Sequence, residues 1–182
     1  AIIAAVSTRD KLDTAVKSLC STIFLLTGSI FDLQDTIDNV HKAGKKVYID
    51  VDLMEGFSKD KTFLKYIKDV LLPDGIITTR SSLAKKAKSM GLFVIQRFFI
   101  FDSMSLQSGI NSALEIKPDI IEVLPGISVK IIREVKEKTH QPVIGSGLIT
   151  TREDVINALE AGAMGITTGN TQLWNGITPD KQ

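Results

Sequence analysis

Two glycine-containing turns near the end of the chain have the composition of a phosphate-binding site. Residues 145–147 read Gly-Ser-Gly and residues 168–170 read Thr-Gly-Asn, and each closes a short apolar run. Backbone without bulky side chains lets a phosphate approach the N–H groups of a turn or helix N-terminus, where the helix dipole also favours an anion. We therefore predict that the two turns hold one phosphate; the alternative is that the glycines only form tight turns. The predicted contact residues are Gly145, Ser146, Gly147, Thr168, Gly169 and Asn170.

Charged side chains stand at the ends of the earlier apolar runs. Carboxylates hydrogen-bond to vicinal hydroxyl groups and guanidinium groups bind oxyanions, so this set suits a small polyol phosphate. Two alternatives stay open. Arg97 and Glu122 could simply form a buried ion pair, and strand alternation allows only one of Asp50 and Asp52 to point inward. The predicted residues for the polyol end of the ligand are Asp50, Asp52, Arg80, Arg97 and Glu122.

The residues that would make this protein an enzyme are misplaced or missing. His41 lies in a predicted helix and His140 at a helix end, so neither reaches the strand ends to polarise a carbonyl. Residues 50–55 read DVDLME, which is similar to the DxKxxD motif of orotidine-phosphate decarboxylase-like barrels, but Asp52 replaces the proton-donating lysine. A Schiff-base lysine is also absent, because Glu122 occupies its strand position. We predict a binding protein with no catalytic residues; an isomerase or lyase acting on a small sugar phosphate is the alternative.

The sequence contains few residues that could bind a metal or a cofactor or form a reactive cysteine site. Asp50, Asp52 and Glu55 could supply oxygen ligands to magnesium, but neither a histidine nor a nucleophile accompanies them. Cys20 is the single cysteine, which excludes an internal disulfide and a multi-cysteine zinc site, and we expect it to serve packing. We therefore predict no metal site and no cofactor.

Charge and hydropathy exclude several protein classes. Lys and Arg number 22 against 21 Asp and Glu, a formal charge of +1, so any contact with nucleic acid needs a local basic patch. The chain has no apolar run of about 18 residues and no signal-peptide pattern, and we expect a cytoplasmic protein without membrane partners. Its 182 residues suit one domain, and a few residues upstream of Ala1 could be absent.

The elements that position these residues repeat eight times. Each continuous apolar run, typical of a strand covered on both faces, is followed by a segment of helical periodicity. Eight such units predict an α/β fold, a small single-domain TIM-type (β/α)8 barrel over residues 1–182. The predicted strands are 2–6, 23–26, 47–51, 75–78, 93–98, 120–124, 143–146 and 165–168. The predicted helices are 9–18, 33–43, 61–71, 81–90, 105–115, 128–138 and 152–161, with a short last one near residue 173.

The chain is short for this fold, which seldom needs fewer than about 200 residues. We therefore expect minimal loops, an irregular second or eighth unit, and a frayed tail over residues 175–182. Barrels of this kind carry their sites at the carboxyl ends of the strands, and the loops after the seventh and eighth strands often bind phosphate. The two glycine turns follow those strands.

Six segments, taken in order, carry a family resemblance: VDLMEG, GIITTRSSLAKKAK, VIQRFFIFDS, PDIIEVLPG, GSGLITTREDV and TTGNTQLW. Together they resemble the glycerol-3-phosphate responsive antiterminators, from about Ile2 to Trp174, and IITTR, IQRFFIFDS and IEVLPG are the most specific. The family's last two turns tend to read GGF and TSN. Here they read Gly-Ser-Gly-Leu and Thr-Gly-Asn, which keeps the small residues.

The resemblance implies a TIM-type barrel that binds glycerol 3-phosphate as its effector. It also implies action on the leader mRNA of glycerol-utilisation operons, which prevents transcription termination. Binding RNA requires cations on an outer face, and two predicted helices that neighbour each other in a barrel are rich in lysine. An ordinary solvated surface is the alternative, and a homo-oligomer stays open. The predicted RNA contacts are Lys61, Lys65, Lys68, Lys85, Lys86 and Lys88.

Overall fold

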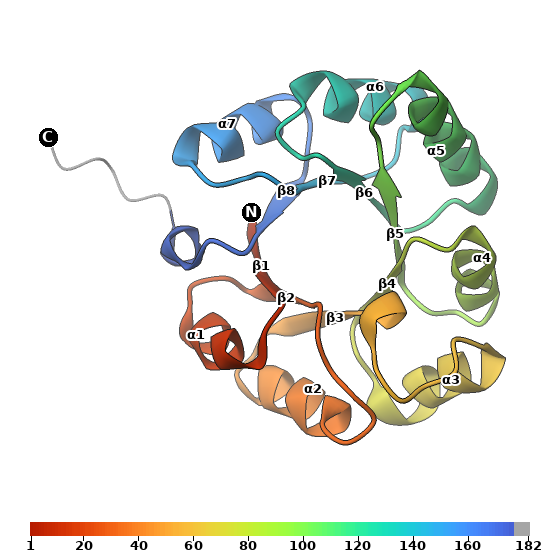
Figure 1. Cartoon of the computed structure of the whole chain (residues 1–182), viewed down its shortest axis with the longest axis vertical. Helices are drawn as coiled ribbons and strands as arrows, with labels where there is room; N and C mark the ends of the chain where they lie inside the picture. Colours follow the sequence, from red (N-terminus) through yellow and green to blue (C-terminus); the bar gives the residue numbers. More distant parts are fainter. Residues whose placement is uncertain (177–182) are drawn as a thin grey trace, which may run out of the picture.

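Eight parallel strands close into a barrel in the computed structural model, which describes residues 1–176. The strands follow chain order around the ring, and β1 pairs with β8 to close it (Figure 1). The predicted α/β fold of the TIM-barrel type is therefore confirmed. The strands are β1 (Ile2–Val6), β2 (Thr22–Leu25), β3 (Lys46–Asp50), β4 (Gly75–Thr78), β5 (Val94–Phe99), β6 (Ile120–Leu124), β7 (Val143–Ser146) and β8 (Gly165–Thr168).

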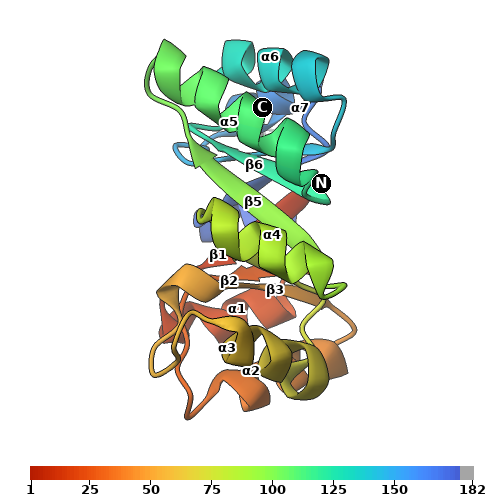
Figure 2. The same cartoon turned by 90° about the vertical axis from the view of Figure 1, so that its right-hand side faces the viewer.

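Seven α-helices cover the outside of the barrel, one after each of the first seven strands (Figures 1 and 2). None of the helices within residues 1–176 is long and apolar enough to cross a membrane. The helices are α1 (Leu12–Lys17), α2 (Leu33–Lys42), α3 (Lys61–Tyr66), α4 (Ser81–Ser89), α5 (Ser103–Ile116), α6 (Val129–Thr139) and α7 (Arg152–Glu160). Short helical turns accompany them: η1 (Arg9–Lys11), η2 (Val51–Leu53), η3 (Ile67–Leu71) and η4 (Thr171–Asn175).

The short chain is accommodated by three irregular units. The expected irregularity of the eighth unit is confirmed, because η4 replaces a full helix, whereas the second unit is regular. The first and third units also differ from expectation: η1 precedes a six-residue α1, and α3 continues into the π-helical turn η3. Most of the tail that we expected to be frayed, residues 177–182, lies outside the described residues.

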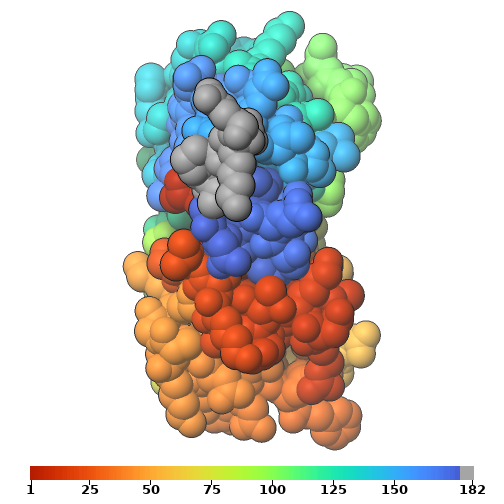
Figure 3. Space-filling model, turned by 90° about the vertical axis from the view of Figure 1, so that its left-hand side faces the viewer, coloured from red at the N-terminus to blue at the C-terminus, as the bar shows by residue number. Residues whose placement is uncertain are grey.

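The turn η4 covers the seam between the first and last strands. Figure 3 shows it between the segments of α1 and α7 on the outside of the barrel. Trp174 anchors it, because its side chain is buried and its indole N–H donates to the Thr168 carbonyl oxygen at 2.8 Å. Within residues 1–176, η4 with its buried Leu173 and Trp174 therefore takes the place that a helix has in the other units.

Side chains that point into the barrel form two layers of different chemistry. The layer at the amino ends of the strands is apolar and consists of Ile3, Phe24, Ile77, Ile95, Ile120 and Ile144. The layer at the carboxyl ends is polar and consists of Asp50, Arg97, Glu122, Ser146 and Thr167. A cavity of about 180 Å³ lies against the apolar layer at the amino ends of the strands. We call the opposite end of the barrel, where the strands terminate, the mouth.

Gly126 illustrates how closely the backbone segments approach at this end. A Cβ atom on Gly126 would lie 2.5 Å from the Ser146 nitrogen and 2.6 Å from the Gly145 carbonyl carbon. Both atoms belong to the backbone of β7, which cannot move aside cheaply. The loop after β6 can therefore pack against β7 only if residue 126 lacks a side chain.

We expect Gly126→Ala to lower the free energy of unfolding by about 1–3 kcal/mol, the usual cost of overpacking. Urea or thermal unfolding followed by circular dichroism measures this change. Gly169→Ala is the matched control, because its added Cβ would meet nothing closer than the Ala5 carbonyl oxygen at 3.8 Å. Equal stability of the two variants would contradict this account of the loop.

Candidate ligand-binding site

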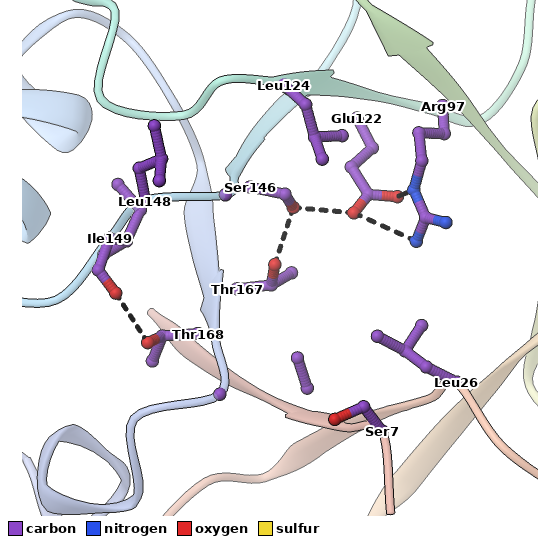
Figure 4. Close-up of a pocket in the computed structure, with 13 residues that line it drawn as sticks. Ser7, Leu26, Arg97, Glu122, Leu124, Ser146, Leu148, Ile149, Thr167 and Thr168 are labelled. Atoms are coloured by element: carbon purple, nitrogen blue, oxygen red, sulfur yellow. Dashed lines mark hydrogen bonds and ion pairs between the residues drawn. The ribbon is translucent and has the colours of Figure 1, made fainter.

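A cavity of about 300 Å³ opens at the mouth of the barrel. Its walls come from the ends of β1, β2, β5 and β6 and from the turns that follow β7 and β8 (Figure 4). Leu26, Leu124 and Leu148 form apolar parts of the wall, and Arg97 and Glu122 form charged parts. The volume is at the lower end of the range for binding pockets, which suits a small ligand.

A chain of hydrogen bonds crosses the interior of the barrel beneath this cavity. Arg97 is its centre: the guanidinium Nε donates to Glu122 Oε2 at 3.0 Å, and Nη1 forms a short ion pair with Asp50. Glu122 Oε1 in turn accepts from the Ser146 hydroxyl at 2.6 Å, and Ser146 Oγ accepts from the Thr167 hydroxyl at 2.6 Å (Figure 4). We call these five residues, from β3, β5, β6, β7 and β8, the polar belt.

Burial sets the electrostatics of the belt. Burial raises the pKa of the Asp50 carboxyl, while the Arg97 guanidinium opposes that rise. Burial alone would lower the pKa of Arg97, but the carboxylates of Glu122 and Asp50 outweigh it and raise the pKa. Arg97 therefore stays charged, and its charge is already matched by two acidic groups. The belt can accept hydrogen bonds from the hydroxyl groups of a ligand, but it does not attract a phosphate. The phosphate of a ligand would have to lie away from it.

The turn after β7 provides such a place. Gly147 (φ 86°) and Leu148 (φ 61°) are both in the left-handed region, where Leu is unusual. The turn leads to Thr151, whose side chain accepts from the Asp154 N–H and forms a capping box that starts α7. Among the described residues, the N–H groups of Leu148 and Gly169 find no acceptor. Two donors that border the cavity are thus available to an oxyanion.

The turns after β7 and β8 are fastened to each other. The Thr168 hydroxyl donates to the Ile149 carbonyl oxygen at 2.7 Å, and the Asn170 amide donates to the Thr150 carbonyl oxygen at 2.9 Å. Both turns therefore form one rigid unit, although 20 residues separate Thr150 from Asn170. Binding of a ligand that contacts both turns would therefore cost little conformational entropy, because the turns are already ordered.

The structure divides the residues predicted for the phosphate into two groups. Four line the cavity: Ser146, Gly147, Thr168 and Gly169. Gly145 does not, because it is buried within β7 where an added Cβ would lie 3.3 Å from Gly126, so its small size serves packing. Asn170 supports the turn with its side chain instead of lining the cavity.

The residues predicted for the polyol end are also divided. Arg97 and Glu122 line the cavity, and they form the buried ion pair that was the alternative interpretation. Asp50 belongs to the belt but does not line the cavity. Asp52 follows the strand in η2 and accepts from the Thr78 and Thr79 side chains and the Thr79 N–H.

Arg80 lies at the rim, outside the cavity. Its Nε is 3.9 Å from Asp52 Oδ1, and its side chain is 54% exposed. The acidic residues considered for magnesium are likewise separated, because Asp50 pairs with Arg97 while Asp52 is bonded to β4. Within residues 1–176, no group of three or more His, Cys, Asp or Glu side chains is arranged to hold a metal ion.

Sequence reasoning missed two polar residues that line the cavity. Thr167, rather than Thr168, points its hydroxyl into the barrel, and Ser7 extends the wall just after β1. Alternation along β8 could have identified Thr167, because it lies opposite Ser146 in the register of the two strands. Ser7 is the first residue after β1 and was not considered among the candidate residues.

The predicted RNA-binding lysines differ in their surroundings. Lys85 pairs with Glu115 at 3.5 Å, and Lys88 pairs with Asp119 at 3.0 Å. Lys68 donates to the Met90 carbonyl oxygen at 2.6 Å. Lys61, Lys65 and Lys86 are exposed and form no ion pair within the described part of the chain.

Fold and cavity together define a (β/α)8 barrel with a small, partly polar binding cavity at the carboxyl ends of its strands. The chain belongs to the glycerol-3-phosphate responsive antiterminator family, whose sequence model matches residues 2–174. This result confirms the resemblance seen in the sequence motifs.

Individual relatives agree with this assignment. The crystal structure of the glycerol uptake operon antiterminator regulatory protein of Listeria monocytogenes is similar with a TM-score of 0.92 and 32% identity, over 97% of this chain and 96% of that one. A glycerol uptake operon antiterminator-related protein of Thermotoga maritima has a TM-score of 0.83 and 29% identity, over 96% and 98%. The uncharacterized protein YgcP of Escherichia coli (strain K12) is 39% identical over 173 residues, which cover 95% of this chain and 91% of YgcP.

Gly169→Val should abolish or strongly weaken oxyanion binding at the mouth. The fold has space for a side chain there, but the cavity does not, and each charge-assisted hydrogen bond that is broken costs roughly 1.5–3 kcal/mol. Calorimetric titration with sulfate, phosphate and glycerol 3-phosphate measures the effect. Gly169→Ala, which adds a smaller side chain, is the control and should weaken binding less. Unchanged affinity in Gly169→Val, or an anion found elsewhere in soaked crystals, would rule out this position.

Proposed function

We propose that this protein is a transcription antiterminator that binds glycerol 3-phosphate in the mouth cavity. The liganded protein binds the leader mRNA of glycerol-utilisation operons. Membership of the antiterminator family supports the regulatory part of this proposal. Glycerol 3-phosphate acts as an effector that is bound and released, and neither a cofactor nor a metal is required.

The observation that carries the proposal is the two-ended chemistry of the cavity. One end has the unpaired N–H groups of Leu148 and Gly169, which suit a phosphate. The other end has Glu122, and Arg97 is already paired there with Glu122 and Asp50, so this end suits the hydroxyl groups of a polyol better than a phosphate. A three-carbon polyol phosphate has one end of each kind, so it fits this arrangement better than inorganic phosphate does.

Binding without turnover is consistent with the lining of the cavity. None of the described residues that line it is a lysine, histidine or cysteine. A reaction next to a carbonyl would need a general base or a Schiff-base amine at the mouth. Arg97 and Glu122 hold each other in a fixed pair and are poorly suited to exchange protons with a substrate. Incubation of the purified protein with triose and pentose phosphates tests the enzymatic alternative directly.

Glu122→Gln should weaken binding of glycerol 3-phosphate by about 1–3 kcal/mol while leaving phosphate affinity nearly unchanged. The amide removes one of the two carboxylates around Arg97 and the acceptor that we assign to a ligand hydroxyl. Calorimetry with both ligands separates the two ends of the site. Glu115→Gln, an exposed position on α5, is the control. If native protein bound both ligands equally well, the assignment of the polyol end would fail.

Glycerol 3-phosphate should strengthen leader-RNA binding by about 5- to 150-fold, the range of typical allosteric coupling. Linkage requires RNA to strengthen ligand binding by the same factor. Fluorescence anisotropy of labelled leader RNA, with and without ligand and over a salt series, measures the coupling. The effect should disappear in Gly169→Val. Equal RNA affinity with and without ligand would leave a metabolite-binding protein without this sensor function.

A further inference from the structure

A second cavity lies on the outer face of the barrel, separate from the mouth. Its volume is about 530 Å³, and it opens between the loop after β2 and the start of α3. Ile30 forms one wall, Gly56 and Phe57 form the base, and Phe63 and Tyr66 of α3 form the other wall. We call it the aromatic groove. A space of this size accepts a planar group larger than the glycerol 3-phosphate assigned to the mouth.

The groove gathers an unusual share of the aromatic side chains of the chain. Phe57 and Phe63 stack with ring centroids 4.3 Å apart, and Tyr66 lies 6.0 Å from Phe57. Phe31 follows Ile30 on the facing loop and is 93% exposed. Together with the apolar walls of the groove, Phe31 extends an exposed apolar patch, and contiguous patches of this kind mark interaction sites.

Two exposed lysines that form no ion pair in the described part of the chain flank the same groove. Lys61 and Lys65 are one helical turn apart on α3, next to the row formed by Thr62 and Tyr66. On the neighbouring α4 (Figure 2), two lysines are paired with acidic residues, and Lys86 is exposed and forms no ion pair within residues 1–176. The positive charge beside the groove therefore comes from α3.

One acidic residue inside the groove indicates which part of a polyanion enters it. Asp60 lines the groove and accepts from the Phe63 N–H at 3.1 Å as the cap of α3. Its second carboxylate oxygen has no donor among the described residues. A carboxylate repels a phosphate group but accepts hydrogen bonds from the amino or imino N–H of a base. The groove has aromatic walls, a hydrogen-bond acceptor inside and cations at its edge. This combination favours entry of a nucleic-acid base and leaves the phosphate backbone outside.

We infer that the aromatic groove receives an unpaired base of single-stranded RNA, while Lys61 and Lys65 contact the adjoining phosphates. This inference rests on the proposed function and deepens it by naming the place and the kind of RNA contact. Stacking on aromatic side chains with a basic track beside them is how proteins hold single strands. Of the two lysine-rich helices predicted to contact RNA, it keeps α3 and adds the loops beside it.

A single segment connects the groove to the effector cavity. Asp50 begins it as the partner of Arg97 in the polar belt, and Phe57 and Asp60 end it in the groove. Between them, the buried Met54 accepts a short hydrogen bond from Lys59, whose ammonium also lies 5.4 Å from the Phe63 ring centroid. Burial lowers the pKa of Lys59, and the charge of Arg80 at the mouth lowers it further, whereas Asp52 and Asp50 partly raise it. A ligand that contacts Arg97 would therefore act on Asp50 through their ion pair, and along this segment on the groove.

The test compares native protein with Phe31→Ser and Tyr66→Leu, using single-stranded leader RNA and a perfect duplex of the same sequence. Both variants should bind the single strand about 5- to 150-fold more weakly, as expected when one base no longer stacks on an aromatic side chain. Tyr66→Phe should keep native affinity. Affinity for the duplex, which offers no free base, should be unchanged in all variants. Urea unfolding checks that Tyr66→Leu remains folded, and Phe31→Ser is safe because its side chain packs on little.

Matched controls stand on the far side of the barrel. Phe101→Ser removes an 82% exposed aromatic from the loop after β5 and should leave RNA affinity unchanged. Lys61→Ala with Lys65→Ala should weaken binding and reduce the salt slope by about one unit for each RNA phosphate that is no longer neutralised. Lys130→Ala with Arg133→Ala on α6 removes the same amount of charge, and it should change neither the RNA affinity nor the salt slope.

The possible failures are distinguishable. If the native protein binds leader RNA and responds to glycerol 3-phosphate, but Phe31→Ser and Tyr66→Leu behave like native protein, the groove assignment is wrong and the proposed function stands. If the native protein binds no leader RNA at any salt concentration, both fail. Loss of a protein partner in these variants, with RNA affinity intact, would identify the groove as a protein-docking surface and overturn the inference.

Discussion

The interaction on which the site depends is the sharing of one guanidinium by two buried carboxylates. Asp50 and Glu122 come from strands β3 and β6, and Arg97 of β5 supplies the counter-charge to both in the barrel interior. Removing one partner of such a buried pair typically costs about 3–5 kcal/mol, because the other charge is left uncompensated. A packed hydrophobic layer would stabilise the barrel at least as well. The ion pairs are therefore better understood as a device that keeps polar groups fixed at the mouth.

That device divides the barrel into a structural half and a functional half. The apolar layer packs at the amino ends of the strands, and the belt above it continues through Ser146 to Thr167. Because Ser146 immediately precedes the glycine turn after β7, the belt and the turn are held by the same strand. Fixed geometry between the two ends of a cavity is what allows recognition of ligand length as well as charge.

The fold could be predicted from sequence because strands covered on both faces leave continuous apolar runs, and eight of these recur at a regular spacing. The glycine turns could be placed for the same reason, since they interrupt the last two runs. Side-chain partners could not. Lys85 and Lys88 lie in a segment without acidic residues, but Glu115 and Asp119 reach them from the next unit of the barrel. Asp52 and Arg80 stand near strand ends, yet η2 and the bonds to Thr78 and Thr79 keep Asp52 away from the cavity. The position of a residue along a strand predicts at which end of the barrel it lies. The direction of its side chain depends on the loops, whose geometry leaves no periodic signal in the sequence.

The position of Trp174 makes the chain its own spectroscopic reporter. It is the single tryptophan in the sequence, and its indole N–H is bonded to the Thr168 carbonyl oxygen, one residue before Gly169. Its emission therefore comes from one known place, next to a turn that borders the mouth cavity. Any change in the polarity or hydrogen bonding of that turn reaches the indole directly, so occupancy of the cavity can be followed in the unmodified protein without an attached dye.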